Sequence, residues 1–403
     1  MGLKIGIVGC GQFGCRFIDI YKNHPLVEEV VLADSVKDRA ITAGEKYGIT
    51  KIYGGLDEVL ETDIDAVCIF TQRQLHGPMA IQALKAGKHV CCAVPMATDV
   101  EDVKEIIRLV EETGLIYMTN ETSYYYPNTI FCRERYKKGE FGEFTFADAQ
   151  YVHDMSHFYE PYKHSGGPNW KRIAGFPPMF YPTHSVSMVL SVTEAHVTKV
   201  SCMGFEDHHE DGIFGEELND FGNPFSNETA LMQTSDGGCC RINEFRRVVP
   251  HDGGGEVSMS FMGTNASYAS GVRSYYTKRD QKTEDISEEV TCIQGNLREE
   301  EDNLIRDEVL KKDFYSGTAP IHPIQRLPET FHAVPNGHEG SHQFLTDDFC
   351  KAVNTKKLPP NDAWAGARFC VPGLIAHESA MKGGILLDVP YFGEAPKNWE
   401  RIE

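Results

Sequence analysis

The sequence has little of three features that would assign it to a special class: long apolar runs, paired cysteines and excess positive charge. No apolar stretch approaches the ~20 residues that a membrane-spanning helix needs. The twelve cysteines include no CxxC pair of the zinc-binding kind, so we interpret them as core thiols that suit a reducing cytosol. The 39 basic residues face 59 acidic ones, a net charge of −20, which argues against a nucleic-acid or anionic-membrane partner.

The N-terminal residues also lack a secretory signal, because Met1 to Lys4 has neither a basic region nor a cleavage site. We therefore expect a cytoplasmic protein. Hydrophobic residues make up 41% of the 403 positions and charged residues 24%, as in a globular protein. The chain is long for a single core. We predict two domains, residues 1–122 and 123–403.

A glycine-rich motif opens the first domain. The apolar strand Lys4 to Val8 continues directly into Gly9-Cys10-Gly11-Gln12-Phe13-Gly14, and a helical pattern follows. This is GxGxxG in a strand–turn–helix context. Gly9 permits the tight turn, Gly11 lets the backbone approach a pyrophosphate, and Gly14 lets helix and strand pack closely. The helix N-terminus would bind the pyrophosphate.

An acidic residue follows at the spacing that dinucleotide binding requires. The strand Val30 to Ala33 ends in Asp34, about twenty residues after the last glycine. The Asp34 carboxylate can accept hydrogen bonds from both ribose hydroxyls and would repel a 2′-phosphate. The motif therefore predicts NAD as the cofactor, in preference to NADP.

Further strands, at 65–70, 88–92 and 116–118, alternate with helices, which predicts a parallel, doubly wound sheet. Ligands bind at the carboxyl ends of such strands. We expect the following residues around the cofactor: Gly9, Gly11, Gln12, Phe13, Gly14, Asp34, Ser35, Thr71, Gln72, Gln74, His76, Ala93, Val94, Pro95 and Glu121.

The segment from Asp65 to Pro95, DAVCIFTQRQLHGPMAIQALKAGKHVCCAVP, resembles the glucose–fructose oxidoreductase/inositol dehydrogenase/MocA (Gfo/Idh/MocA) family. It has the family's T-P-x-x-x-H-type loop and A-L-x-A-G-K-H-V helix end. The resemblance extends over nearly the whole chain. It implies a Rossmann domain followed by an open antiparallel sheet with helices on one face, and NAD-dependent oxidation or reduction of a sugar, glycoside or cyclic polyol.

One position departs from the family pattern. Where the family has Glu-Lys-Pro, this chain has Ala93-Val94-Pro95, and Val94 cannot help to move a proton as the family lysine does. Tyr181-Pro182-Thr183-His184 resembles an element of the NAD-dependent α-N-acetylgalactosaminidases, which also lack that lysine. That resemblance implies Tyr181 and His184 as the acid/base groups, although the usual family aspartate one turn before the histidine falls on Phe180.

Three functions remain open at this point. The leading one is a net oxidoreductase in which His184 takes the hydroxyl proton. The alternative is a redox-neutral glycosidase that oxidises the sugar at C3, eliminates the aglycone, adds water and returns the hydride. The third is a non-catalytic NAD-binding sensor, which the missing lysine also permits.

The second domain begins with an irregular stretch. Residues 151–183 have no clear period and are dense in His, Tyr, Pro and Gly, so we expect a long structureless binding or lid loop. We interpret Arg246-Arg247 as a surface pair or, less favoured, an anion clamp. We expect substrate contacts from Tyr126, His153, Asp154, Trp170, Lys171, Arg172 and Arg246. Regular elements are predicted as strands at 197–203, 230–234, 239–245 and 256–262 and as helices at 185–192, 344–353 and 363–382, the last two packing back near an interdomain cleft.

His153, Asp154 and His157 have the residue types of a metal site, as do His208 and His209. No spacing fixes a third ligand and hydride transfer needs no metal, so we predict none. Residues 280–335 are acidic and irregular, and we expect one helix there, at 297–312. An antiparallel sheet with helices on one side leaves an apolar face, which predicts a homodimer or homotetramer.

Overall fold

The computed structural model describes residues 2–249, 257–293 and 317–402, and the chain separates into two compact units. Unit 1 comprises residues 1–126, 292–367 and 392–403, and unit 2 comprises residues 127–291 and 368–391. The chain first leaves unit 1 four residues after the predicted division at 122/123, but it returns there at Cys292 and again at Phe392. The helix predicted at 297–312 lies outside the described residues.

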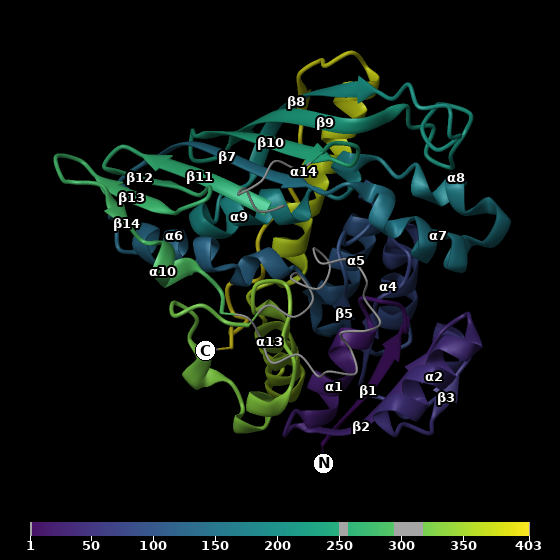
Figure 1. The fold of residues 1–403 in the computed structure, drawn as a ribbon. Coiled ribbons are helices and arrows are strands. Elements are labelled where there is room, and N and C mark those ends of the chain that lie inside the picture. The colour runs from purple at the N-terminus through teal and green to yellow at the C-terminus, as the bar shows by residue number, and fades with distance from the viewer. Residues whose placement is uncertain (1, 250–256, 294–316, 403) are drawn as a thin grey trace. The chain divides into compact units, whose positions relative to one another are not determined.

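Unit 1 is built on a six-stranded sheet of order β3-β2-β1-β4-β5-β6, in which neighbouring strands run parallel (Figure 1). This confirms the predicted doubly wound sheet. The strands are β1 Leu3–Val8, β2 Val27–Ala33, β3 Ile52–Tyr53, β4 Ala66–Ile69, β5 His89–Cys92 and β6 Tyr117–Thr119. The connecting helices are α1 Cys15–Asn23, α2 Lys37–Tyr47, α3 Leu56–Leu60, η1 Arg73–Leu75, α4 His76–Lys85, α5 Val100–Thr113 and η2 Thr122–Tyr125.

The strand order places a topological switch point at β1. The chain proceeds from β1 to β2 on one side, and later strands are added on the other side, beginning with β4. The carboxyl ends of β1 and β4 therefore flank the position where open parallel sheets bind ligands. Helix α1 starts at this edge and is held by its buried face, which includes Phe17, Ile20 and Tyr21.

A later segment completes unit 1. It contains η6 Ile324–Arg326, η7 Glu329–Ala333 and α13 Ser341–Thr355, and the helix predicted at 344–353 is α13. Helix α13 packs on α1, where Phe349 meets Tyr21 edge-on at 6.5 Å between ring centroids. The buried Asp347 and Asp348 of α13 are compensated by Lys351 Nζ at 2.8 Å and Arg326 Nη1 at 2.7 Å, respectively.

Unit 2 is built on a nine-stranded sheet of order β14-β13-β12-β11-β7-β10-β9-β8-β15 (Figure 1). Its neighbouring strands are antiparallel except β7 and β10, because the meander β8-β9-β10 returns beside β7 in the same direction. Helix α9 lies against β7, β10 and β11 and also contacts α6. The strands are β7 Phe144–Val152, β8 Val197–Glu206, β9 Phe225–Thr234, β10 Cys239–Phe245, β11 Val257–Gly263, β12 Ala266–Ala269, β13 Tyr275–Lys278, β14 Glu284–Asp285 and β15 Leu387–Asp388. The longer helices are α6 Pro127–Lys137, α9 Thr183–Thr193 and α14 Ala363–Met381, which begins in unit 1, and α10 is Ser287–Val290.

The prediction of a structureless loop at 151–183 is wrong. Strand β7 continues to Val152, and five short helices follow: η3 Met155–Phe158, α7 Tyr159–Gly166, η4 Gly167–Asn169, α8 Trp170–Ala174 and η5 Pro178–Phe180. The sequence showed no period because each helix is too short to repeat an apolar face. Tertiary packing stabilises them instead, in a small core formed by Met155, Tyr162, Ala174, Ile213 and Phe214.

The nine-stranded sheet exposes apolar side chains on the face opposite α9. Met203 of β8 is 63% exposed and Leu231 of β9 is 54% exposed, whereas their neighbours Cys202 and Ala230 point inward and are buried. Phe205 and Met262 belong to the same outward set. In the part of the chain that the structure describes, no helix combines the length and the apolar character needed to cross a bilayer.

Candidate active site

The glycine-rich turn of unit 1 has the geometry of a dinucleotide cradle. Gly9 adopts a φ of +104°, and a Cβ there would lie 2.4 Å from the Phe70 carbonyl oxygen. A Cβ on Gly14 would lie 2.0 Å from the Gly9 oxygen, so the turn and α1 pack in direct backbone contact. Gly11 instead has open space around its Cβ position. The tight positions and the open one are those that a pyrophosphate at a helix N-terminus requires.

Asp34 lies at the end of β2 and is tied to this turn. Its Oδ2 accepts the Cys10 N–H and its Oδ1 accepts the Val36 N–H, both at 2.8 Å. The side chain is buried, whereas the adjacent Ser35 is exposed. Because each carboxylate oxygen has a second lone pair, Asp34 can still accept hydrogen bonds from a ribose.

The turns after β4 and β5 are joined by His76. Its Nδ1 lies 2.8 Å from the Pro95 oxygen and its Nε2 lies 3.1 Å from the Thr71 oxygen. Burial lowers the pKa of His76 to about 4, so the ring is neutral at pH 7. A neutral imidazole carries one N–H, so His76 donates to one of these two carbonyl oxygens while its ring contacts both turns of the predicted cofactor site. Val94 lies in the turn after β5, directly before Pro95, and is buried like Ala93.

The remaining cofactor-side predictions lie at the same edge of the sheet or just beyond it. Gln72 and Gln74 are partly exposed after β4. Glu121 follows β6 and is fully buried, and its Oε1 caps η2 by accepting the Ser123 N–H at 2.9 Å. Tyr126, predicted to contact substrate, is buried in unit 1 with its hydroxyl 3.2 Å from Thr122 Oγ1.

Two histidines beside the glycine-rich turn were missed from the sequence. His342 Nε2 lies 2.8 Å from His338 Nδ1, and both rings meet Phe13 edge-on, at 5.7 and 5.4 Å between centroids. Burial, with His338 and Arg16 nearby, places the pKa of His342 well below its usual value. The signal in the sequence was weak: two histidines four residues apart, just before a predicted helix.

In unit 2 the two predicted acid/base residues lie together. Tyr181 directly precedes Pro182 and α9, and His184 is the second residue of that helix. Their rings are 5.2 Å apart and nearly perpendicular. Tyr151 at the end of β7 lies 5.3 Å from the His184 ring and 6.1 Å from the Tyr181 ring. Its hydroxyl is 2.6 Å from Nδ1 of His153, which brings a third predicted residue to the group.

Arg246 joins this group but is neutralised within it. Its Nη2 donates to Glu244 Oε2 at 2.6 Å and its Nη1 donates to the Tyr151 and Phe245 carbonyl oxygens. The guanidinium lies 4.7 Å from the Tyr151 ring centroid and 5.8 Å from that of Tyr181. The surface-pair interpretation is wrong, because both arginines of the pair are buried in ion pairs.

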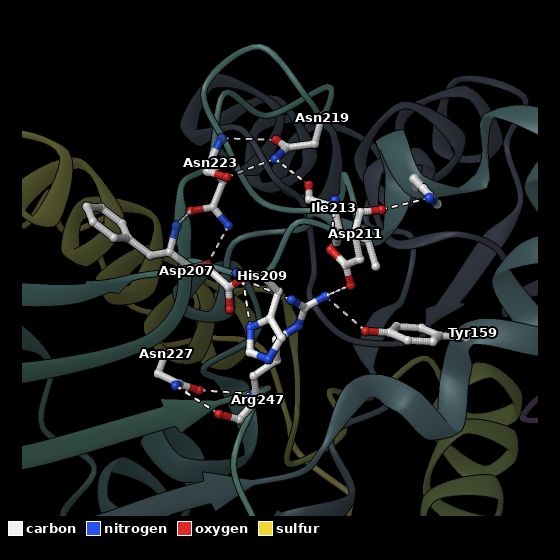
Figure 2. Close-up of polar contacts among 11 residues, drawn as sticks. Tyr159, Asp207, His209, Asp211, Ile213, Asn219, Asn223, Asn227 and Arg247 are labelled. Carbon is white, nitrogen blue, oxygen red and sulfur yellow. Dashed lines mark hydrogen bonds and ion pairs between the residues drawn. The ribbon is translucent and has the colours of Figure 1, made fainter.

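Arg247, the second arginine, fastens the short helices after β7 to the loop at 207–223 (Figure 2). Its Nη1 donates to Asp207 Oδ1 at 2.9 Å, and its Nη2 donates to Asp211 and, at 3.0 Å, to the Tyr159 hydroxyl. Within that loop, Asn219 and Asn223 bond one another and the surrounding backbone (Figure 2). These contacts hold the short helices after β7 and the loop at 207–223 together.

The other predicted substrate residues lie in or beside these short helices. Asp154 caps η3 by accepting the Ser156 N–H at 2.9 Å. Trp170 packs against Tyr159 at 5.3 Å, Lys171 Nζ donates to the Asp211 oxygen at 2.7 Å, and Arg172 Nε donates to Asp220 at 2.6 Å. Across residues 2–249, 257–293 and 317–402, no three His, Cys, Asp or Glu side chains are grouped to hold a metal ion.

The sequence from residue 3 to 121 matches the family described as "Oxidoreductase family, NAD-binding Rossmann fold" (Gfo/Idh/MocA). A 4-carboxy-2-hydroxymuconate-6-semialdehyde dehydrogenase of Sphingobium sp. is 32% identical over 139 residues, which are 34% of this chain and 44% of that protein. A glycosyl hydrolase family 109 protein of Streptomyces filamentosus is 23% identical over 414 residues, covering 97% of this chain and 77% of that protein. The chain thus spans less than half the length of the first of these relatives.

A solved structure of levoglucosan dehydrogenase in complex with NADH and levoglucosan is similar over 97% of this chain and 100% of that one. The sequence identity is 18% and the TM-score is 0.72. At this identity the likeness shows that the two proteins share a fold.

Proposed function

Because residues 3–121 match the Gfo/Idh/MocA oxidoreductase family, we propose that the protein is an NAD-dependent oxidoreductase of that family. It transfers a hydride to or from a ring carbon that bears a hydroxyl, on a sugar, glycoside or cyclic polyol. The observation that carries the proposal is the turn in which Gly9 and Gly14 have no room for a side chain while Gly11 is open. The shared fold with levoglucosan dehydrogenase supports the carbohydrate class.

Each unit has its own part in this proposal. The backbone N–H groups at the start of α1 bind the pyrophosphate and Asp34 binds the adenosine ribose. NAD supplies a nicotinamide ring that takes up or returns a hydride. His184, as a neutral imidazole, accepts the hydroxyl proton, and Tyr181, whose ring centroid is 5.2 Å away, holds or relays it.

The charge balance around these residues favours an uncharged substrate. The Arg246 guanidinium, the cation nearest the Tyr151 and Tyr181 rings among the contacts described, is paired with Glu244 at 2.6 Å. A substrate carboxylate would have to compete with that buried partner. The aromatic rings of Tyr151 and Tyr181 suit the apolar face of a sugar ring. We therefore infer a neutral sugar or polyol.

One screen tests this function against its alternatives. The protein is incubated with NAD and free sugars, levoglucosan, myo-inositol or p-nitrophenyl glycosides, while absorbance at 340 nm and released nitrophenol are recorded together. Accumulation of NADH with a free sugar supports the oxidoreductase. If the protein binds NAD but neither NADH nor nitrophenol appears with any substrate, the oxidoreductase is contradicted and the non-catalytic NAD-binding sensor is the remaining function.

A redox-neutral glycosidase is the second candidate. Two observations favour it: Val94 replaces the family lysine, and the similarity to a glycosyl hydrolase family 109 protein extends over 97% of this chain. In that reaction the hydride returns to the same sugar, so nitrophenol is released without net NADH. That outcome in the screen, with p-nitrophenyl α-N-acetylgalactosaminide among the substrates, would identify the glycosidase.

We expect the wild-type protein to bind NAD at least about tenfold more tightly than NADP, because Asp34 repels a 2′-phosphate. Asp34→Ala removes that repulsion and should bring the two affinities close together. Isothermal calorimetry with each cofactor measures the ratio. Asp38→Ala, which removes an exposed carboxylate from the first turn of α2, is the matched control and should keep the preference. Equal or tighter binding of NADP by the wild type would disprove the assignment.

We also expect a dimer or tetramer that associates through the outward face of the nine-stranded sheet. Leu231→Glu places a charge among exposed apolar residues on a protein of net charge −20, and should shift the mass by light scattering toward the 45.1 kDa monomer. Val272→Glu, at a position that is 81% exposed but lies outside the strands, should leave the assembly intact. A sharp wild-type monomer at micromolar concentration would contradict this prediction.

A further inference from the structure

A row of polar side chains crosses the inner face of the nine-stranded sheet, where most of the other strand residues are apolar. Glu228 of β9 lies directly opposite Glu244 of β10, and Glu244 lies opposite Tyr151 of β7. Glu228 is 1% exposed and Glu244 is 0% exposed. Like charges opposite one another on neighbouring strands are destabilising, and a buried carboxylate requires compensating partners. The partners of these two glutamates therefore indicate what the row does.

The partners of Glu228 lie just before Tyr181. Its Oε2 accepts the Met179 N–H at 2.7 Å, and Met179 belongs to η5, which ends at Phe180. Its Oε1 lies 2.8 Å from Nδ1 of His377 in α14. Glu228 thereby fixes the backbone that leads into the Tyr181 side chain.

The partners of Glu244 lie on the other side of the same segment. Its Oε1 contacts the hydroxyl of Ser185, which follows His184 in α9 and also lies 2.9 Å from the Pro182 oxygen. Its Oε2 accepts Arg246 Nη2 at 2.6 Å, and that guanidinium lies over the rings of Tyr151 and Tyr181. The two glutamates thus bind the chain at Met179, two residues before Tyr181, and at Ser185, directly after His184.

We propose that Glu244 is a positioning residue of the acid/base pair: it fixes His184 through Ser185 and Tyr181 through Arg246, and its charge governs how readily His184 takes up a proton. The assignment of His184 as a base rests on the proposed function, whereas the effect of Glu244 on His184 does not. The elements around Glu244 carry these titratable and charged groups: Arg246 directly after β10, Glu228 of β9, Tyr151 of β7, His153 directly after β7, Tyr181 before α9, His184 in α9, and His377 of α14, which contacts Glu228.

The charges of Glu244 and Arg246 determine the direction in which the proton affinity of His184 changes. Burial raises the pKa of Glu244 to about 7, against the opposing effects of Arg246, Ser185 and His184. Above that pH the ionised carboxylate favours the imidazolium form of His184. When Glu244 is protonated, Arg246 has no compensating charge and favours the neutral imidazole. The pair is therefore coupled near neutral pH, where an acid/base residue must change its protonation state.

Glu244→Gln tests the coupling with little change of shape. The glutamine oxygen can accept from Arg246 and its amide can donate to Ser185 Oγ, so the fold should persist. We expect the titration midpoint of His184 to move to lower pH by on the order of one unit. The measurement is a pH titration of the histidine ring resonances in protein labelled with 13C-histidine. Among the sixteen histidines, His184 is identified as the signal missing from His184→Asn.

The control is Asp148→Asn, which removes a carboxylate from the outward face of the same sheet, where it pairs with Arg241, and should leave the midpoint unchanged. A His184 midpoint that is equal in Glu244→Gln and wild type would overturn the proposal. This titration needs no substrate, so it is independent of the screen at 340 nm. With a substrate in hand, Glu244→Gln should also move the acidic limb of the kcat/KM profile to lower pH while KM changes little. An unmoved limb would overturn the positioning role.

Discussion

His184→Ala is expected to lose about 10²- to 10⁴-fold in kcat, the usual cost of removing a general base. Its affinity for NAD should stay within a few-fold of wild type, because His184 is assigned to the substrate and not to the cofactor. Val94 stands at the position of the family lysine and cannot accept a proton, so His184 is the residue to which we assign the hydroxyl proton. Initial rates at 340 nm, on a substrate from the screen, and calorimetry with NAD give the two quantities.

The comparison variants separate a base from a structural residue. His208→Ala removes an exposed histidine of unit 2 and should retain full activity. Tyr181→Phe should cost less than His184→Ala if the hydroxyl only relays the proton, and more if it is the acid itself. Near-normal turnover by His184→Ala would show the assignment to be wrong, and His153 or Glu121 would then become the candidate.

The cofactor side was predictable because its rules are local. The spacing of Gly9, Gly11 and Gly14 and the position of Asp34 follow from the space a turn needs and the length of one βα unit. The structure shows the steric reason at Gly9 and Gly14, where a Cβ would meet backbone oxygen. Whether these residues bind NAD stays a prediction, which the experiments above test.

The residues of the later segment were not predictable in the same way. His338 and His342 are separated from Phe13 by more than 300 positions, and no local pattern indicates that α13 packs on α1. His338 and Glu339 also adopt positive φ values of 45° and 50°, which non-glycine residues rarely do. Only the tertiary structure places this loop beside the glycine-rich turn.

The inward orientation of Glu228 and Glu244 in unit 2 could have been predicted from the alternation of buried and exposed residues along their strands. Ala230 and Met232 on β9, and Cys240 and Ile242 on β10, are the buried positions of a period-two pattern. Continuing that pattern puts Glu228 and Glu244 on the inner face, where a charge must have a partner. The pattern alone does not give their register, and only the pairing of β9 with β10 shows that the two carboxylates are opposed.

Gly11→Val is expected to weaken NAD binding by about tenfold to 10²-fold without loss of stability. In the protein itself, a Cβ at this position meets nothing within 4 Å, and Gly11 is not among the glycines with positive φ. The valine side chain would instead occupy the space in which a pyrophosphate approaches the backbone. Charge-assisted hydrogen bonds of the kind it would disrupt are worth about 1.5–3 kcal/mol, which corresponds to that range of affinity.

Gly14→Ala distinguishes a cofactor effect from a folding effect. Its Cβ would lie 2.0 Å from the Gly9 oxygen, so the turn or α1 must shift, at the cost of about 1–3 kcal/mol that overpacking typically carries. Thermal unfolding without cofactor should therefore show a lower Tm for Gly14→Ala and an unchanged Tm for Gly11→Val, while calorimetry shows weakened NAD binding for both. If Gly11→Val bound NAD as tightly as the wild type, the pyrophosphate would not lie against this turn, because a branched side chain at the open position leaves no room for it.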